Sequence, residues 1–272
     1  MKTISNSLIV LALILCAFTA GDKPVDLSGN ETGMLQYKQA EEEEDVPNTL
    51  SDSEKAAGWK LLFDGKTSAG WRGALKESFP AEGWTIADGA ITIHAGGNSA
   101  HGGDIVSVDE YSAFELKVDF KITKGANSGI KYFVIESEKH PGAVFGLEYQ
   151  VLDDDEHPDA KLFTTFPGSR RCAGLYDLIK PENVRFNGIG QWNQAIIKVF
   201  PNNHVEHWLN GFKTLEYERG SEAFRALIKG SKYVEPSYNA DGPFGEAPKG
   251  HILLQDHGDE VSYRNIKIKI LD

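Results

Sequence analysis

Three predicted strands carry polar and aromatic side chains at positions that alternate with their apolar residues. These strands cover residues 147–152, 204–209 and 251–257. Because successive strand residues point to opposite faces, the apolar residues take the core side and the alternating residues take the open side. The residues placed on the open side are Glu148, Gln150, Glu206, Trp208, Gln255 and His257.

This combination of side chains suits sugar recognition. An indole ring stacks on sugar C–H groups, and carboxylate, amide and imidazole groups bind hydroxyls or transfer protons. We therefore predict a carbohydrate site on this face, with Asp104, Asp153 and His207 as near neighbours. The alternative for Trp208 is that a long loop simply covers it.

The connection at residues 153–191 is the longest stretch between predicted strands. A loop of that length in a compact domain is usually functional, so it forms either a wall over the site or a solvated cover. The run Asp153-Asp154-Asp155 lacks the alternating spacing of a calcium-binding loop. No dedicated metal site is predicted, and a divalent cation stays an open alternative.

The elements that must position these residues are almost all strands. Asp88-Gly89 and Asn210-Gly211 are strong signals for tight hairpin turns. Helical spacing occurs only at Ser221–Lys229, with Ser221 as the cap. Further strands are predicted at residues 84–87, 90–94, 114–120, 130–135, 195–200, 212–217 and 261–270. The pattern predicts an all-β fold, a two-sheet β-sandwich or jelly roll with one short helix.

The charge balance excludes a nucleic-acid partner. The chain of 272 residues has a net charge of −12 and lacks the basic footprint that such binding requires. Half of the acidic excess lies in residues 1–55, where residues 41–45 form a run of five acidic side chains. Like charges in a run repel one another and stay solvated, so we predict a flexible acidic linker over residues 21–55.

The first twenty residues resemble an export signal. Lys2 precedes an uncharged apolar run at residues 8–18, which is too short to span a bilayer. Residues 13–16 resemble a lipobox ending in Cys16, so a lipid on Cys16 is the predicted route to a membrane. We expect residues 1–20 to be removed or lipidated, and the protein to be periplasmic or membrane-anchored in a bacterium. The folded domain is then residues 56–272, in which Cys172 has no cysteine partner.

Blocks spread across residues 58–272 resemble the 3-keto-disaccharide hydrolase family, formerly a domain of unknown function. The blocks occur in the same order as in the family. The whole set is therefore specific for the family, although no single block is. The blocks are GWKLLFDGKT at 58–67, GDIV at 103–106, NSGI at 127–130, EYQVLD at 148–153, AGLYD at 173–177, NHVEHWLNG at 203–211, GHILLQDHG at 250–258 and RNI at 264–266.

The resemblance implies a concanavalin A-like sandwich that acts on glycosides oxidised at C3, such as 3-keto-trehalose. A C3 ketone acidifies the hydrogen on C2, so a base can form an enolate that expels the C1 substituent, after which water adds. Glu148 or His257 is the expected base, and His207 is a further catalytic candidate. The substrate-binding candidates are Asp104, Gln150, Asp153, Glu206, Trp208 and Gln255.

Two other functions stay open. A conventional glucanase of this fold places its carboxylates together on one strand, whereas Glu148 stands alone on the open face of its strand. A carbohydrate-binding module without catalysis is the third alternative, since a fold does not establish an activity. The aglycone, the linkage and the oligomeric state are not fixed by these patterns.

Overall fold

The computed structural model describes residues 46–96, 102–137, 139 and 144–272. The chain divides into two units, residues 1–42 and 43–272, and the described residues all belong to the second. The predicted export signal, Cys16 and the acidic run at 41–45 lie outside the described residues. None of the described helices has the length and apolar character that crossing a membrane would need.

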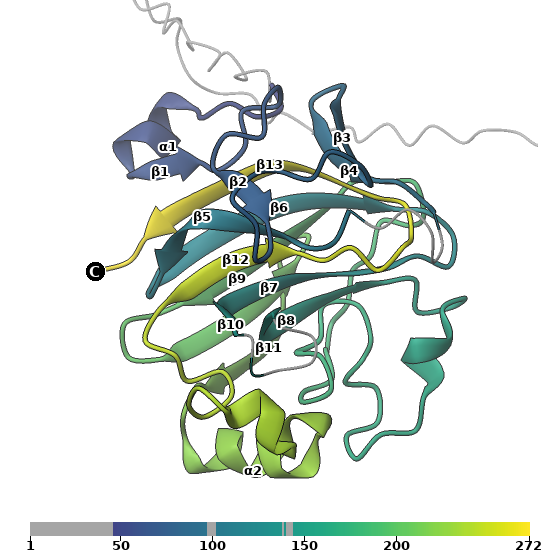
Figure 1. Ribbon diagram of the computed structural model, residues 1–272, viewed down its shortest axis with the longest axis vertical. Helices are drawn as coiled ribbons and strands as arrows, with labels where there is room; N and C mark the ends of the chain where they lie inside the picture. Colours follow the sequence, from purple (N-terminus) through teal and green to yellow (C-terminus); the bar gives the residue numbers. More distant parts are fainter. Residues whose placement is uncertain (1–45, 97–101, 138, 140–143) are drawn as a thin grey trace, which may run out of the picture. The chain divides into compact units, whose positions relative to one another are not determined.

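The described elements are mostly strands, as expected (Figure 1). The strands are β1 (Trp59–Leu61), β2 (Trp71–Gly73), β3 (Trp84–Ala87), β4 (Ala90–Ile93), β5 (Ile105–Tyr111), β6 (Phe114–Ile122), β7 (Asn127–Glu136), β8 (Val144–Leu152), β9 (Asn193–Val199), β10 (His204–Leu209), β11 (Phe212–Glu218), β12 (Gly250–Leu254) and β13 (Val261–Ile270). The helices are α1 (Asp52–Ala56), η2 (Pro158–Lys161), α2 (Glu222–Gly230), η3 (Lys232–Val234) and η4 (Pro236–Asn239).

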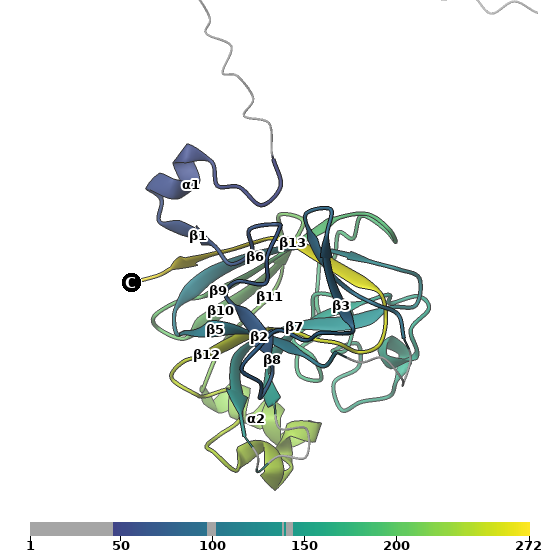
Figure 2. The same cartoon turned by 45° about the horizontal axis from the view of Figure 1, so that its top comes forward.

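The strands form two antiparallel sheets. The large sheet has eight strands in the order β11-β10-β9-β6-β13-β4-β3, with β1 also paired to β13. The small sheet has five strands in the order β2-β5-β12-β7-β8. Figure 2, turned from the first view, shows the two layers stacked on each other. The predicted all-β sandwich is confirmed.

The core lies between the inner faces of the sheets, where strand alternation buries every second residue. Leu116 and Val118 of β6 are buried with Phe114, and Leu147 and Tyr149 of β8 are buried opposite them. The rings of Phe114 and the small-sheet residue Tyr132 meet edge to face at 6.4 Å between centroids, a geometry that aromatic pairs favour.

The two hairpin turns have the backbone geometry that their residues permit. Asp88 and Gly89 have φ of 51° and 73°, and Asn210 and Gly211 have φ of 49° and 82°. Two consecutive residues with positive φ make the type I′ turn, which matches the twist of the flanking strands. The turns join β3 to β4 and β10 to β11, as predicted.

The predicted helix is α2. The Ser221 side chain accepts a hydrogen bond from the Phe224 N–H, and Phe224 and Ile228 are buried on one side of the helix. Figures 1 and 2 both place α2 at the end of the sandwich away from α1. The connection after α2, through η3 and η4, supplies part of the candidate site.

The folded unit begins earlier than the boundary expected at residue 56. The Asn48 N–H donates to Asn265 Oδ1 at 2.5 Å, and the Asn265 N–H donates back to Asn48 Oδ1 at 2.9 Å. Glu54 of α1 pairs with Lys267 of β13 at 2.6 Å. These paired amides and charges attach residues 48–54 to β13, so this stretch belongs to the sandwich rather than to a solvated linker.

Candidate active site

A pocket of about 300 Å³ opens on the outer face of the small sheet. Its walls come from β7, β8, the loop before β5, the loop after β12, the long connection after β8 and the segment after α2. The lining residues are Asp104, Asn127, Lys131, Val144, Phe145, Gly146, Glu148, Tyr176, Lys232, Tyr233, Tyr238, Gln255 and His257. Four of the predicted site residues, Asp104, Glu148, Gln255 and His257, are therefore together.

Glu148 occupies the floor of the pocket. It projects from β8 on the face opposite Leu147 and Tyr149, as strand alternation predicted, and is 6% exposed. Its partner in register on β7 is Lys131, and its side chain lies over the backbone of Gly129. Among the described residues, none donates a hydrogen bond to its carboxylate. A buried carboxylate without a donor is free to act on whatever enters the pocket.

Two lysines bring positive charge to this carboxylate. Lys131 Nζ lies 3.9 Å from Asp104 Oδ2, which places the first lysine between the two acidic residues. Lys232 enters from the segment after α2, and its Nζ lies 4.3 Å from the centre of the Tyr176 ring. Both lysines attract the charged form of Glu148.

Burial shifts the ionisation of the pocket toward neutral forms. It raises the pKa of Glu148 and of Asp104, because a charged carboxylate loses solvation there. It lowers the pKa of Lys232 for the same reason, although Glu148 and Asp177 act in the opposite direction. Shifts of this kind are typical of groups that transfer protons.

Two short loops position Asp104 and His257. The Asp256 N–H donates to Asp104 Oδ1 at 2.9 Å, and the Gly103 N–H donates to Asp256 Oδ2 at 3.1 Å. Asp256 also accepts the Gly258 N–H at 3.0 Å. These reciprocal bonds hold the loop after β12 against the loop before β5. Gln255 and His257 therefore lie beyond the end of β12 rather than within a strand.

The long connection after β8 builds one wall of the pocket. The Tyr176 N–H donates to the Glu148 carbonyl at 3.0 Å, so this segment runs along the edge of β8. Asp177 follows with φ of 63°, and its carboxylate accepts the Arg170 Nε–H at 2.8 Å and the Lys232 backbone N–H at 3.0 Å. This carboxylate ties the connection to the segment that carries Lys232.

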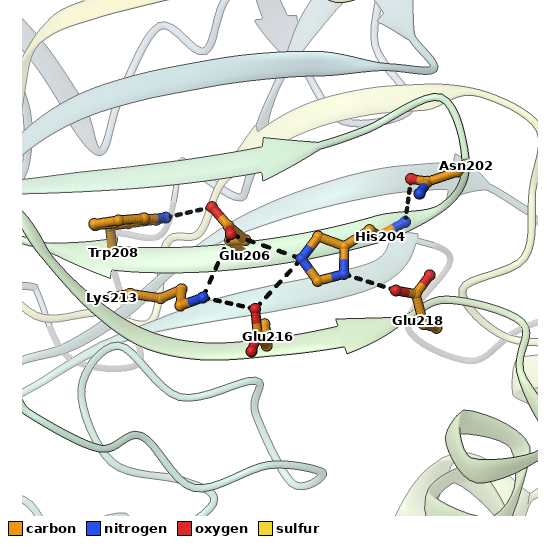
Figure 3. Close-up of polar contacts among 7 residues, drawn as sticks. All are labelled: Asn202, His204, Glu206, Trp208, Lys213, Glu216 and Glu218. Carbon is orange, nitrogen blue, oxygen red and sulfur yellow. Dashed lines mark hydrogen bonds and ion pairs between the residues drawn. The ribbon is translucent and has the colours of Figure 1, made fainter.

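Glu206 and Trp208 do not belong to this pocket, which corrects the predicted three-strand face. Their strand, β10, lies in the large sheet between β9 and β11, whereas β8 and β12 lie in the small sheet. Figure 3 shows Glu206 accepting the Trp208 Nε1–H at 2.9 Å, beside Lys213 and His204. Alternation distinguishes inside from outside but does not say which sheet a strand joins.

His207 lies in the core and is not among the described residues that line this pocket. It is fully buried, and its Nε2 is 2.8 Å from Tyr132 Oη, which in turn is 2.7 Å from Tyr217 Oη. Burial lowers the pKa of His207 to about 3. Its predicted catalytic role is therefore wrong, because the inner face of β10 packs against the small sheet.

Gln150 and Asp153 also have structural roles instead of the predicted contacts with substrate. Gln150 is fully buried, and its Nε2 donates to Asn127 Oδ1 at 3.0 Å, behind the pocket wall. The Asp153 carboxylate accepts the backbone N–H groups of Gly125 at 2.8 Å and Asp155 at 3.1 Å. The bond from Asp155 closes the turn that follows β8, and the bond from Gly125 ties that turn to the segment before β7.

Sequence reasoning missed the basic and tyrosine residues of the pocket. Lys131 could have been predicted from strand alternation. It lies on the same face of β7 as Gly129, and its partner in register on β8 is Glu148. Lys232, Tyr233 and Tyr238 come from η3, η4 and their flanks, where no periodic pattern indicated an orientation. Their placement follows from tertiary packing alone.

Two groups of described side chains have donor atoms close enough to hold a metal ion. One is His157, His257 and Asp259, at the pocket, and the other is His204, Glu206 and Glu216, on the large sheet. Within each group the donor atoms lie within 4.8 Å of one another.

Two antiparallel sheets with a polar pocket on one outer face define a β-sandwich of the jelly-roll class. Residues 58–269 match the family described as the 3-keto-alpha-glucoside-1,2-lyase-like domain, and the chain belongs to this family. The resemblance seen in the sequence blocks is thereby confirmed.

Individual relatives agree with this assignment. A protein of Bacteroides thetaiotaomicron named 3-keto-disaccharide hydrolase is 37% identical over 275 residues, covering 93% of this chain and 91% of the relative. A solved structure from Parabacteroides distasonis is 33% identical, with a TM-score of 0.71 over 84% of this chain and all of that one. A second structure from the same organism is 26% identical, with a TM-score of 0.53 over 78% of this chain and 99% of that one.

Proposed function

We propose that this protein cleaves glycosides whose sugar carries a ketone at C3, 3-keto-disaccharides such as 3-keto-trehalose among them, by elimination followed by hydration. The observation that carries the proposal is the buried Glu148 carboxylate, which accepts no hydrogen bond from the residues that the structure describes and is flanked by Lys131 and Lys232. The family and the name of the Bacteroides thetaiotaomicron relative support the substrate class.

Glu148 takes the proton from C2 in this mechanism. The C3 ketone makes that proton acidic, and the electron pair left on C2 delocalises onto the ketone oxygen as an enolate. Burial raises the pKa of Glu148, which makes its carboxylate a stronger base than an exposed glutamate. A base positioned in this way contributes about 10²–10⁴ in rate.

Lys131 and Lys232 stabilise the enolate oxygen. Negative charge develops on that oxygen only as the C2–H bond breaks, so fixed cations favour the transition state over the bound substrate. Lys232 is held for this purpose by the bond from its backbone N–H to Asp177.

A water molecule completes the proton transfers at the mouth of the pocket, which His257 lines. When the enolate collapses, a double bond forms between C1 and C2, the C1–O bond breaks, and the departing oxygen takes a proton from this water. The hydroxide that remains adds to C1, and a proton returns to C2 from Glu148. The sum is hydrolysis. Gln255 and Tyr176 line the pocket, and in this proposal they bind sugar hydroxyls.

The test compares 3-keto-trehalose with ordinary trehalose, which lacks the acidic C2 proton. We expect glucose release from the first only, and in D₂O we expect deuterium at C2 of the released 3-keto-glucose. Free 3-keto-glucose, incubated in D₂O with and without the enzyme, measures exchange after release. Equal cleavage of both sugars contradicts the proposal. The elimination step is contradicted if the enzyme fails to hydrate the glucal-type intermediate, supplied as synthetic 2-hydroxy-3-keto-glucal, to 3-keto-glucose.

A further inference from the structure

We propose that His157, His257 and Asp259 form a binding site for a first-row divalent transition metal at the mouth of the pocket. The three donor groups come from two loops, residues 153–161 after β8 and residues 255–259 after β12, and their donor atoms lie within 4.8 Å of one another. Two imidazoles with one carboxylate favour Zn²⁺, Co²⁺, Mn²⁺ or Fe²⁺ over Ca²⁺ and Mg²⁺, which prefer oxygen ligands.

Neighbouring groups orient the ligands, as they do in metal sites. Asp259 Oδ2 accepts the Asn127 N–H at 3.0 Å, which fixes the direction of the carboxylate. His257 sits in the loop that Asp256 closes through its bonds to Gly103 and Gly258. The rings of His157 and His257 are perpendicular, with 6.0 Å between their centroids.

His157 has one contact that metal binding must break. Its Nδ1 accepts a hydrogen bond from the Asp159 N–H at 3.2 Å. A neutral ligating imidazole carries its proton on the nitrogen that does not bind the metal, so coordination through either nitrogen removes this acceptor. This hydrogen bond is long and lies in a partly exposed turn. Its loss therefore costs only a small part of the free energy of metal binding.

The second metal-capable group is a weaker competitor, which makes it a useful control. The carboxylates of Glu206 and Glu216 already pair with Lys213 Nζ, at 3.5 and 2.6 Å (Figure 3). A cation there must displace an ammonium group. No ion pair of this kind is found for Asp259 with a lysine or arginine among the described residues.

Three protein ligands leave coordination positions open, and His257 also lines the pocket. Two of these positions can accept the adjacent C2 and C3 oxygens of an α-hydroxy ketone. This role on the substrate rests on the proposed function, whereas metal binding itself does not.

The test is titration of untagged, chelator-treated protein with Co²⁺, followed by visible absorption and calorimetry. We expect one Co²⁺ per chain, with affinity reduced at least tenfold in His157→Ala and in Asp259→Asn, which can still accept the Asn127 N–H. His204→Ala is the matched control and should bind Co²⁺ as the wild type does. No stoichiometric binding, or loss of binding in His204→Ala alone, overturns the proposal.

Catalysis is measured separately on the same samples. A Co²⁺-dependent spectrum that changes when 3-keto-glucose is added supports coordination of the substrate, and an unchanged spectrum overturns that role. If Co²⁺ binds as expected but 3-keto-trehalose stays intact with every metal tested, the proposed function fails and the metal site stands.

Discussion

The side chain of Glu148 lies directly over the backbone of Gly129 on the neighbouring strand. A Cβ at position 129 would stand 2.9 Å from the Glu148 Cδ and closer still to Oε1. The absent side chain on β7 therefore creates the space in which the β8 carboxylate rests. This relationship links a backbone position to the proposed base.

Gly129→Ala should displace the carboxylate and lower kcat at least about tenfold, since small errors in the position of a catalytic group are costly. Steady-state kinetics on 3-keto-trehalose measure the effect, and thermal unfolding shows whether the sandwich stays intact. In the Gly129→Ala background, Glu148→Asp should cost less than it does alone, because the shorter side chain avoids the methyl group. If the Gly129→Ala enzyme is folded and its kcat is unchanged, the Glu148 carboxylate does not need to lie over residue 129 for catalysis.

Glu148→Gln should lower kcat by about 10² or more, because the amide cannot accept the C2 proton. Glu206→Gln is its matched control, since Glu206 is a glutamate on the outer face of the other sheet. We expect Glu206→Gln to keep normal turnover of 3-keto-trehalose. If the two variants lose activity equally, the reaction takes place on the large sheet and not in the pocket that contains Glu148.

The pH dependence of kcat/KM should be narrow. Activity requires ionised Glu148 and is lost as the pH falls through its pKa, which burial raises above the ordinary 4.5. It also requires protonated Lys232 and is lost as the pH rises through its pKa, which burial lowers below 10.5. Lys232→Arg should move the alkaline limb to higher pH, because guanidinium keeps its proton. If the alkaline limb does not move in this variant, a group other than Lys232 causes the loss of activity at high pH.

Acid should destabilise the fold through His207. The folded protein holds this ring neutral down to a pKa of about 3, whereas the unfolded chain takes up a proton below 6.5. The stabilisation that comes from the neutral His207 ring is complete above pH 6.5 and is lost progressively as the pH falls to about 3. At about 1.4 kcal/mol per pKa unit, the loss is on the order of 5 kcal/mol. Urea unfolding at several pH values should show a shallower dependence in His207→Gln than in the wild type. If the free energy of unfolding depends on pH in the same way in both proteins, His207 does not cause the loss of stability in acid.

The fold could be predicted from the sequence because its signals are local. Alternation along residues 114–120 and the turn residues Asn210 and Gly211 act between neighbours in the chain. Strand β5 escaped prediction because Ile105, Val106 and Ser107 are buried in succession, which removes the alternation.

The site could be predicted only in part because it depends on long-range pairing. Alternation correctly placed Glu148 away from the core, but nothing local assigns β10 to the large sheet, so Trp208 was grouped with the wrong face. Lys232 reaches the pocket through a bond to Asp177, fifty-five positions away in sequence. Such a contact has no signal in either segment alone.

The bond from the Lys232 backbone to Asp177 also limits how parts of this fold can be exchanged. One carboxylate holds both the connection after β8 and the segment after α2, through Arg170 and Lys232. A graft that moves only one of these loops into another sandwich would leave the buried Asp177 carboxylate without one of its donors, or the Lys232 backbone amide without its acceptor. The two loops form a single transferable module, and chimaeras that vary the specificity of this pocket must carry them as a pair.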